Sequence, residues 1–117
     1  MLVIEDDEDL REVLTLHLDR FFHVTQAASV EQALAFVRTG RCDVVVCDLM
    51  MPSGGAEVWL QHCVQIDPRL DECTILLTGG ATNASAASLI RSREDKVLFK
   101  PINISELRPL IERLAHV

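Results

Sequence analysis

Residues 43–48 read Asp43-Val44-Val45-Val46-Cys47-Asp48, and this run is the strongest indication of the fold class. Its central residues are all apolar, with no polar residue to mark a face exposed to water. Strands of this kind are typical of parallel sheets that carry helices on both sides. We therefore expect residues 43–48 to form a central strand that ends in a carboxylate.

On both sides of residues 43–48, short apolar runs alternate with segments in which apolar residues have helical spacing. The predicted strands are residues 2–4, 23–26, 43–48, 74–78 and 97–99. The predicted helices follow them at residues 10–21, 29–40, 56–66, 83–92 and 103–114. This alternation predicts one doubly wound α/β domain over residues 1–117, a (βα)5 arrangement with a parallel sheet and right-handed crossovers.

The sequence also predicts where helices begin and which sides face the core. Ser29 and Gln32 are spaced as a capping box, Gly40 is placed to end that helix, and Asn103 is placed to cap the last one. Helical spacing predicts an inward face for the first helix formed by Leu10, Val13, Leu14, His17, Leu18 and Phe21.

Composition excludes several classes of protein. The chain has 117 residues, 49% of them hydrophobic and 25% charged, which is the composition of a single globular domain. A net charge of −7 argues against nucleic acid or an anionic membrane as the main partner. No apolar run approaches the roughly 20 residues of a membrane span, and the N-terminus lacks the basic region of a signal peptide. We expect a cytoplasmic protein.

The cysteines and histidines show no spacing typical of a metal site or a disulfide framework. We expect the cysteines to be small buried side chains in a reducing compartment; they are Cys42, Cys47, Cys63 and Cys73. The histidines are scattered, at His17, His23, His62 and His116.

Polar side chains follow four of the predicted strands: Glu5 and Asp6 after the first, Asp48 at the end of the third, Thr78 at the fourth and Lys100 after the fifth. The carboxyl ends of parallel strands share one edge, where such sheets bind ligands. Clustered carboxylates repel each other unless a cation lies between them, and an all-oxygen set suits Mg²⁺. A lysine and a hydroxyl beside them indicate a phosphoryl group, with Asp48 as the nucleophile.

Taken singly, each of these residues has an ordinary structural explanation. Acids at residues 7–9 suit the first turn of a helix, and an aspartate such as Asp48 often forms a turn. Thr78 is a common strand terminator, and Lys100-Pro101 reads as a loop. Their coincidence at one predicted edge favours a functional site.

These residues carry a resemblance to a known family. The motifs are Val3-Ile4-Glu5-Asp6-Asp7, Asp48-Leu49-Met50-Met51-Pro52, Leu76-Leu77-Thr78-Gly79 and Phe99-Lys100-Pro101. Asp48 follows Asp6 by 42 residues, Thr78 follows Asp48 by 30, and Lys100 follows Thr78 by 22. In motifs and spacing the whole chain resembles the receiver domain of bacterial two-component response regulators. The resemblance implies a flavodoxin-like sheet with strand order 2-1-3-4-5.

The resemblance also implies a function. A histidine kinase or a histidine phosphotransfer domain, in another chain or in the same one, would phosphorylate Asp48 in a Mg²⁺-dependent reaction. Asp6 would bind Mg²⁺ directly and Glu5 through water, with Asp48 and the Met50 carbonyl oxygen as further ligands. Such a domain catalyses only its own phosphorylation and dephosphorylation.

In the same family the lysine pairs first with the phosphoacceptor and then with the phosphoryl oxygens, a role that falls to Lys100. Thr78 would hydrogen-bond to the phosphoryl group and move toward it. The Lys100–Pro101 bond is expected to be cis. The surface made by the fourth helix, fifth strand and fifth helix would switch, and it would carry partner contacts or a homodimer.

The chain departs from the family pattern at three places. Val97 stands where a tyrosine or phenylalanine is usual, so an aromatic switch is in doubt. Ala56 stands at a usual glycine position, and Gly54 and Gly55 indicate an earlier turn. The first strand begins almost at Met1, which indicates a piece of a longer protein.

Other interpretations stay open at this point. A haloacid-dehalogenase-type phosphatase would need a second aspartate where Met50 stands, and a dinucleotide-binding domain would need a glycine-rich motif after the first strand. A receiver-like scaffold would bind partners without phosphorylation. The protein from which the domain comes also stays open: it could be a single-domain regulator, a longer regulator or a hybrid sensor kinase. The residue 78–81 turn and the residue 99–102 stretch resemble receivers at the C-termini of hybrid kinases.

Overall fold

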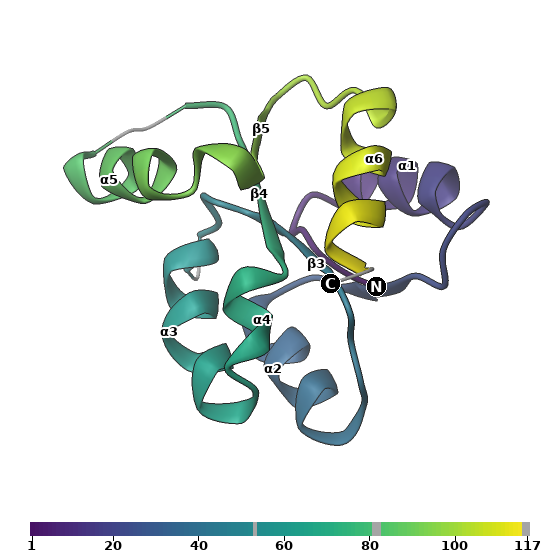
Figure 1. Ribbon diagram of the computed structural model, residues 1–117, viewed down its shortest axis with the longest axis horizontal. Helices are drawn as coiled ribbons and strands as arrows, with labels where there is room; N and C mark the ends of the chain where they lie inside the picture. Colours follow the sequence, from purple (N-terminus) through teal and green to yellow (C-terminus); the bar gives the residue numbers. More distant parts are fainter. Residues whose placement is uncertain (53, 81–82, 116–117) are drawn as a thin grey trace.

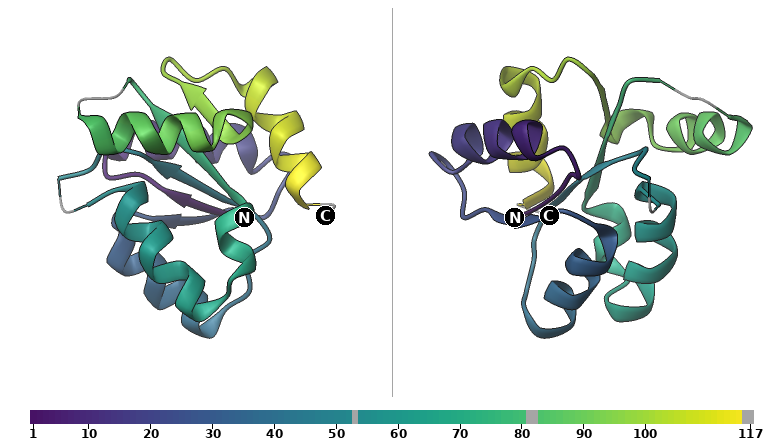
Figure 2. Two further views of the ribbon diagram at one scale, coloured as in Figure 1. Left: turned by 60° about the vertical axis from the view of Figure 1, so that its left-hand side comes forward. Right: turned by 180° about the vertical axis from the view of Figure 1, so that it is seen from behind.

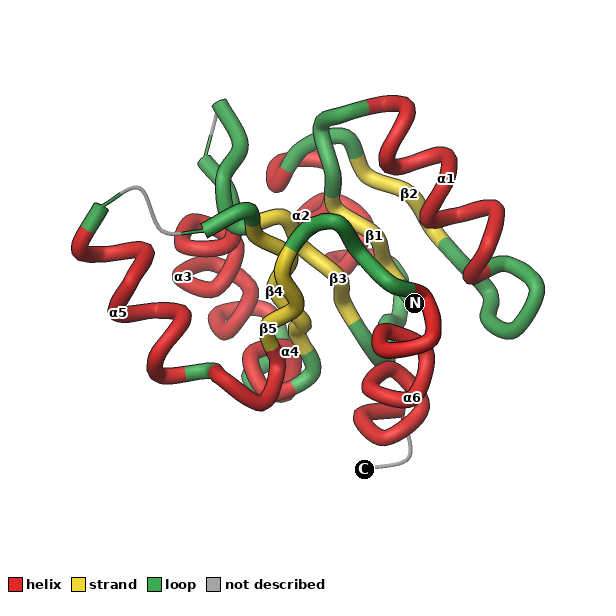
Figure 3. Tube along the Cα trace, turned by 90° about the horizontal axis from the view of Figure 1, so that it is seen from above, coloured by secondary structure: helices red, strands yellow, loops and turns green. Residues whose placement is uncertain are grey.

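The computed structural model describes residues 1–52, 54–80 and 83–115. Its strands form one parallel sheet in the order β2-β1-β3-β4-β5, which Figure 3 shows from above. The strands are β1 (Leu2–Ile4), β2 (Thr25–Ala27), β3 (Val45–Asp48), β4 (Thr74–Thr78) and β5 (Val97–Phe99). The predicted fold class and strand order are confirmed, with β3 in the centre.

Helices cover both faces of the sheet, as Figures 1 and 2 show. α1 (Glu8–Leu18) and α6 (Ile104–Ala115) pack on one face. The other face carries α2 (Val30–Thr39), α3 (Ala56–Ile66), the short α4 (Arg69–Glu72) and α5 (Ala84–Ser92). A 3-10 turn, η1 (Glu94–Lys96), leads into β5.

The central strand sends alternate side chains into two hydrophobic cores. Val45 and Cys47 join the core under α2 and α3, whereas Val44 and Val46 join the core under α1 and α6. All four are at most 1% exposed. Burial on both faces explains why the sequence shows an unbroken apolar run instead of an alternating one.

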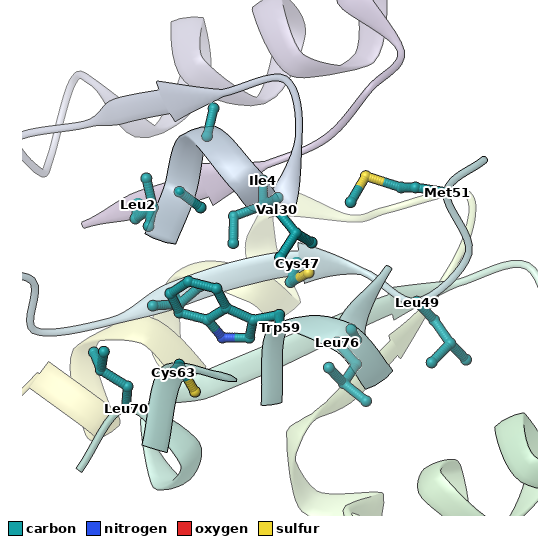
Figure 4. Packing of buried hydrophobic residues seen from close by; sticks show 14 of the residues in the cluster. Leu2, Ile4, Val30, Cys47, Leu49, Met51, Trp59, Cys63, Leu70 and Leu76 are labelled. Atoms are coloured by element: carbon teal, nitrogen blue, oxygen red, sulfur yellow. The ribbon is translucent and has the colours of Figure 1, made fainter. Parts of the chain in front are cut away.

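Trp59 of α3 anchors the larger core (Figure 4). Its side chain is fully buried, and its Nε1 donates a hydrogen bond to Oγ1 of Thr74 at 3.0 Å. Thr74 in turn donates to the Leu70 carbonyl oxygen at 2.6 Å. The polar atoms of both side chains are thereby satisfied, as burial requires.

The predicted helix caps are present. Ser29 accepts a hydrogen bond from the Gln32 amide at 3.1 Å, and the Gln32 side chain accepts one from the Ala28 amide at 2.9 Å. Gly40 ends α2 with its amide on the Phe36 carbonyl oxygen. Asn103 accepts from the Ser105 amide at 2.9 Å at the start of α6.

Several details differ from the sequence predictions. β2 spans Thr25–Ala27, and not residues 23–26, and β3 begins at Val45, and not at Asp43. The first helix spans Glu8–Leu18, and not residues 10–21. The segment between α3 and β4 holds the extra helix α4, where Pro68 has helical backbone angles and the Asp67 side chain accepts a hydrogen bond from the Arg69 amide at 3.1 Å. The inward face of α1 differs as well.

The buried face of α1 is narrower than its apolar spacing predicts. Leu14 and Leu18 are buried, whereas Val13 is 51% exposed, Phe21 is 46% exposed and His17 is also exposed. A helix on a sheet buries only one stripe of side chains, and apolar residues beside that stripe stay at the surface. Phe21 instead contacts α6, where the Arg108 guanidinium lies 3.6 Å from its ring centroid.

The four cysteines are free; Cys47 and Cys63 are buried, as expected, but Cys42 and Cys73 are only partly so. Within the described residues, we find no helix with the length and apolar character needed to cross a membrane.

Two leucines of α1 give a matched test of this packing. Leu18 is fully buried and Leu16 is 70% exposed. Leu18→Ala should lower the free energy of unfolding by about 2–5 kcal/mol, because it removes buried methyl groups and leaves a cavity. Leu16→Ala should change it by less than about 0.5 kcal/mol. Urea unfolding measures both, and equal losses would contradict the packing described for α1.

Candidate functional site

The predicted site residues meet at the carboxyl edge of the sheet. Asp48 and Thr78 are the last residues of β3 and β4, while Glu5 and Lys100 directly follow β1 and β5. The parallel register aligns the strand ends, because Ile4 pairs with Cys47 and Thr78 pairs with Phe99. The topology thus brings together residues far apart in the chain.

Asp48 lies at the centre of the site and is 4% exposed. Its Oδ2 atom accepts a hydrogen bond from Nζ of Lys100 at 2.9 Å. Its Oδ1 atom accepts one from the Met50 amide at 3.1 Å. The backbone of Lys100 is held as well, because its amide donates to the Thr78 carbonyl oxygen at 2.7 Å. Asp48 is therefore oriented from two sides.

Glu5 is a second buried carboxyl, only 1% exposed. Its Oε2 atom accepts a weak hydrogen bond from the Asp7 amide at 3.3 Å. Its Oε1 atom lies 3.5 Å from Nζ of Lys100, but it accepts no hydrogen bond within the described part of the chain. Burial first, and then the charge of Asp48, raise the pKa of Glu5 to about 7.

Lys100 is the cation of this cluster. Burial acts against its charge, but the hydrogen bond to Asp48 and the charges of Asp48 and Glu5 outweigh that effect and raise its pKa above the usual value. The lysine therefore stays charged at neutral pH. One ammonium group neutralises only one of the neighbouring carboxylates.

The carboxylates fit a divalent cation. Ligand atoms of Glu5, Asp6 and Asp48 lie within 4.8 Å of one another. Oxygen atoms are the ligands that Mg²⁺ prefers, and a cation or its water would give Oε1 of buried Glu5 a closer contact than its 3.5 Å approach to Lys100. The predicted ligand from the Met50 carbonyl oxygen stays a prediction.

Thr78 is at the predicted edge, but its hydroxyl is held by a neighbouring turn. Oγ1 accepts from the Gly80 amide at 2.9 Å and donates to the Gly80 carbonyl oxygen at 3.2 Å. Gly80 has a φ of +128°, which side-chain-bearing residues rarely adopt. This contact was not predicted, although a threonine before two glycines is a typical signal for such a turn.

The departures from the family pattern are visible in the structure. Val97 is 8% exposed and packs in the larger core, while Phe99 is 58% exposed. The chain turns at Gly54 and Gly55, as expected from Ala56; Gly54 has a φ of +104°, and any side chain at Gly55 would collide with the Leu49 carbonyl group. The Lys100–Pro101 bond is cis, as expected.

The sequence model of the response regulator receiver domain family matches residues 1–112. The transcriptional regulatory protein AfsQ1 of Streptomyces coelicolor is 37% identical over 87% of this chain and 44% of its own. The chain spans about half the length of the curated relatives it matches first.

Two solved structures are similar over 98% of this chain. One is a CheY-like receiver domain protein from Methanospirillum hungatei, with a TM-score of 0.84 and 20% identity, covering 91% of that chain. The other is a response regulator from Burkholderia pseudomallei, described with a phosphorylated aspartic acid, a calcium ion and citrate. It has a TM-score of 0.77 and 25% identity, covering 67% of that chain.

The raised pKa of Glu5 predicts how stability depends on pH without metal. Glu5 binds its proton more tightly when folded, so its contribution is fully present below pH 4.5 and is lost as pH rises through about 7. Wild type should therefore lose up to about 3 kcal/mol over this range relative to Glu5→Gln. Urea unfolding in a chelator from pH 4 to 8 measures the difference.

Glu72→Gln serves as the control, because Glu72 is an exposed residue just before β4, at the opposite edge of the sheet. It should keep the wild-type pH dependence. A difference between Glu5→Gln and wild type that stays constant with pH would contradict the prediction.

Proposed function

Because the chain belongs to the response regulator receiver domain family, we propose that Asp48 is its phosphoacceptor and that Glu5 and Asp6 hold the Mg²⁺ ion. The observation that carries the proposal is the 2.9 Å contact between Lys100 and Asp48 beside the acidic cluster. Phosphorylated aspartic acid and a bound cation in the similar Burkholderia pseudomallei structure support it.

The transfer is a displacement at phosphorus. A carboxylate oxygen of Asp48 forms the new P–O bond while the P–N bond of a phosphohistidine breaks, and the nitrogen keeps the electron pair. Such reactions depend on positioning and on neutralising charge. Asp48 is already oriented by the Met50 amide and by Lys100.

The metal would be held by the carboxylates of Glu5, Asp6 and Asp48. The Met50 carbonyl oxygen would be a further ligand. Bound Mg²⁺ supplies positive charge to the phosphoryl oxygens. Lys100 stays charged and exchanges its contact with Asp48 for one with a phosphoryl oxygen. Together these groups allow a dianionic phosphoryl group to approach a carboxylate.

Thr78 links phosphorylation to the rest of the fold. Its hydroxyl exchanges its contacts with Gly80 for one with a phosphoryl oxygen, which releases the backbone of Gly80. α5 is weakly attached: Ala86 is its only fully buried residue in the described part of the chain. Phosphorylation thereby changes the surface made by α5, β5 and α6, where a partner or a second copy binds.

The donor is a histidine kinase or a histidine phosphotransfer domain, which places the reaction in the cytoplasm. The relatives that this chain matches include proteins named as transcriptional regulators. Transcriptional regulation is therefore one context that we propose for this chain, and the hybrid kinase context that the residue 78–81 turn and the residue 99–102 stretch resemble is the other. In both contexts the domain passes on a signal and turns over no external substrate.

The proposal predicts a Mg²⁺-dependent gain in mass. Incubated with acetyl phosphate and Mg²⁺, the protein should gain one phosphoryl group by intact-mass spectrometry. Asp48→Asn, which is nearly isosteric, should gain none, and neither should wild type in a chelator. A folded wild-type protein that gains no mass would favour the scaffold interpretation.

The lifetime of the phosphoryl group is a separate prediction. Met50 and Gly80 lie two residues after Asp48 and Thr78, and neither carries a side chain that could orient an attacking water. The phosphorylated form should therefore last minutes or longer, followed by intact mass after donor removal. Met50→Asn, which adds a polar group, should shorten it. A wild-type lifetime of seconds would contradict the prediction.

A further inference from the structure

Arg11, in the first half of α1, reaches back to the acidic loop. Its Nη1 atom donates a hydrogen bond to the backbone carbonyl oxygen of Glu5 at 2.9 Å. Its Nε atom lies 3.3 Å from Oε1 of Gln26 on β2, which holds the guanidinium in place. Arg11 belongs to none of the sequence motifs described above.

The hydrogen bond from Arg11 is made to the peptide that joins two proposed metal ligands. The Glu5 carbonyl belongs to the peptide unit that joins Glu5 to Asp6. The amide on the other side of Glu5 is fixed by the Ala27 carbonyl oxygen at 3.0 Å, and Oε2 by the Asp7 amide at 3.3 Å. Arg11 therefore completes a set of contacts that leaves Oε1 of Glu5 directed at the acidic cluster.

We propose that Arg11 is a positioning residue for the Mg²⁺ site, holding the peptide between Glu5 and Asp6 so that both carboxylates are presented together. The inference rests on the proposed function, because it needs Mg²⁺ to bind at this cluster. Groups that orient metal ligands typically change metal affinity 10- to 100-fold when they are removed.

Charge and position predict opposite results, which makes the proposal testable. Arg11 is a cation near a cation site, so by Coulomb repulsion alone its removal would strengthen Mg²⁺ binding. If Arg11 acts by position, its removal weakens binding. The sign of the change therefore separates the two effects.

The experiment is a Mg²⁺ titration of metal-free protein, followed by the NMR shifts of backbone amides at the site. Arg11→Met should raise the dissociation constant about tenfold. Arg11→Lys, which keeps the charge and one donor, should lie between that variant and wild type. The control is Arg41→Met, because Arg41 is 77% exposed and pairs only loosely with Asp43, at 3.8 Å. This control should bind Mg²⁺ as wild type does, or slightly more tightly.

A second measurement separates positioning from a general loss of structure. In the acetyl phosphate reaction, Arg11→Met should need about tenfold more Mg²⁺ for half-maximal rate, while the rate at saturating Mg²⁺ stays within about twofold of wild type. If Arg11→Met does not fold, Arg11→Lys and Gln26→Met carry the test, each with weaker Mg²⁺ binding than wild type.

The outcomes are distinct. Unchanged or tighter Mg²⁺ binding in the folded Arg11 variants overturns the positioning role and leaves the proposed function intact. A wild-type protein that shows no Mg²⁺ binding overturns the proposed function, and this inference with it.

Discussion

The ion pair between Lys100 and Asp48 joins residues 52 positions apart, and the electrostatic balance of the site depends on it. Asp48 and Glu5 are both almost fully buried, and a buried carboxylate without a partner is costly. Burial, and then the charge of Asp48, raise the pKa of Glu5 to about 7, although Nζ of Lys100 lies 3.5 Å from its Oε1 atom. The proposed Mg²⁺ ion would add positive charge beside carboxylates that the fold already holds close together.

The parallel sheet is the reason that this balance is achieved at a single edge. Each crossover connection returns the chain to the same edge of the sheet before the next strand begins. All strands therefore run in one direction and end at the opposite edge. The alternating side chains of β3 fill two cores, which fixes the direction of Asp48 through the packing of Val44 to Cys47. Chemistry at this edge is thus held by the most deeply buried part of the molecule.

α5 is held less firmly than the central strands. α5 is tethered at one end by the hydrogen bond between Ser85 and Glu57, at 2.8 Å, and beyond its other end by the ion pair between Arg93 and Asp71, at 2.7 Å. Figure 1 shows this helix projecting from the body of the domain. A helix held by these polar contacts, by Ala86 and by the half-buried Leu89 and Ile90 can shift at a lower energetic cost than the central strands β1 and β3.

Apolar runs predicted the strands, the family resemblance predicted their order, and the strand ends indicated the candidate site residues. Apolar runs and caps act locally, so they can be recognised in a sequence. Only the packing of the elements set the narrow buried face of α1, the contact of Arg11 with Gln26 on β2, and the contact of Phe21 with Arg108 on α6. These features depend on how elements distant in sequence approach one another in space, and residue spacing carries no record of that approach.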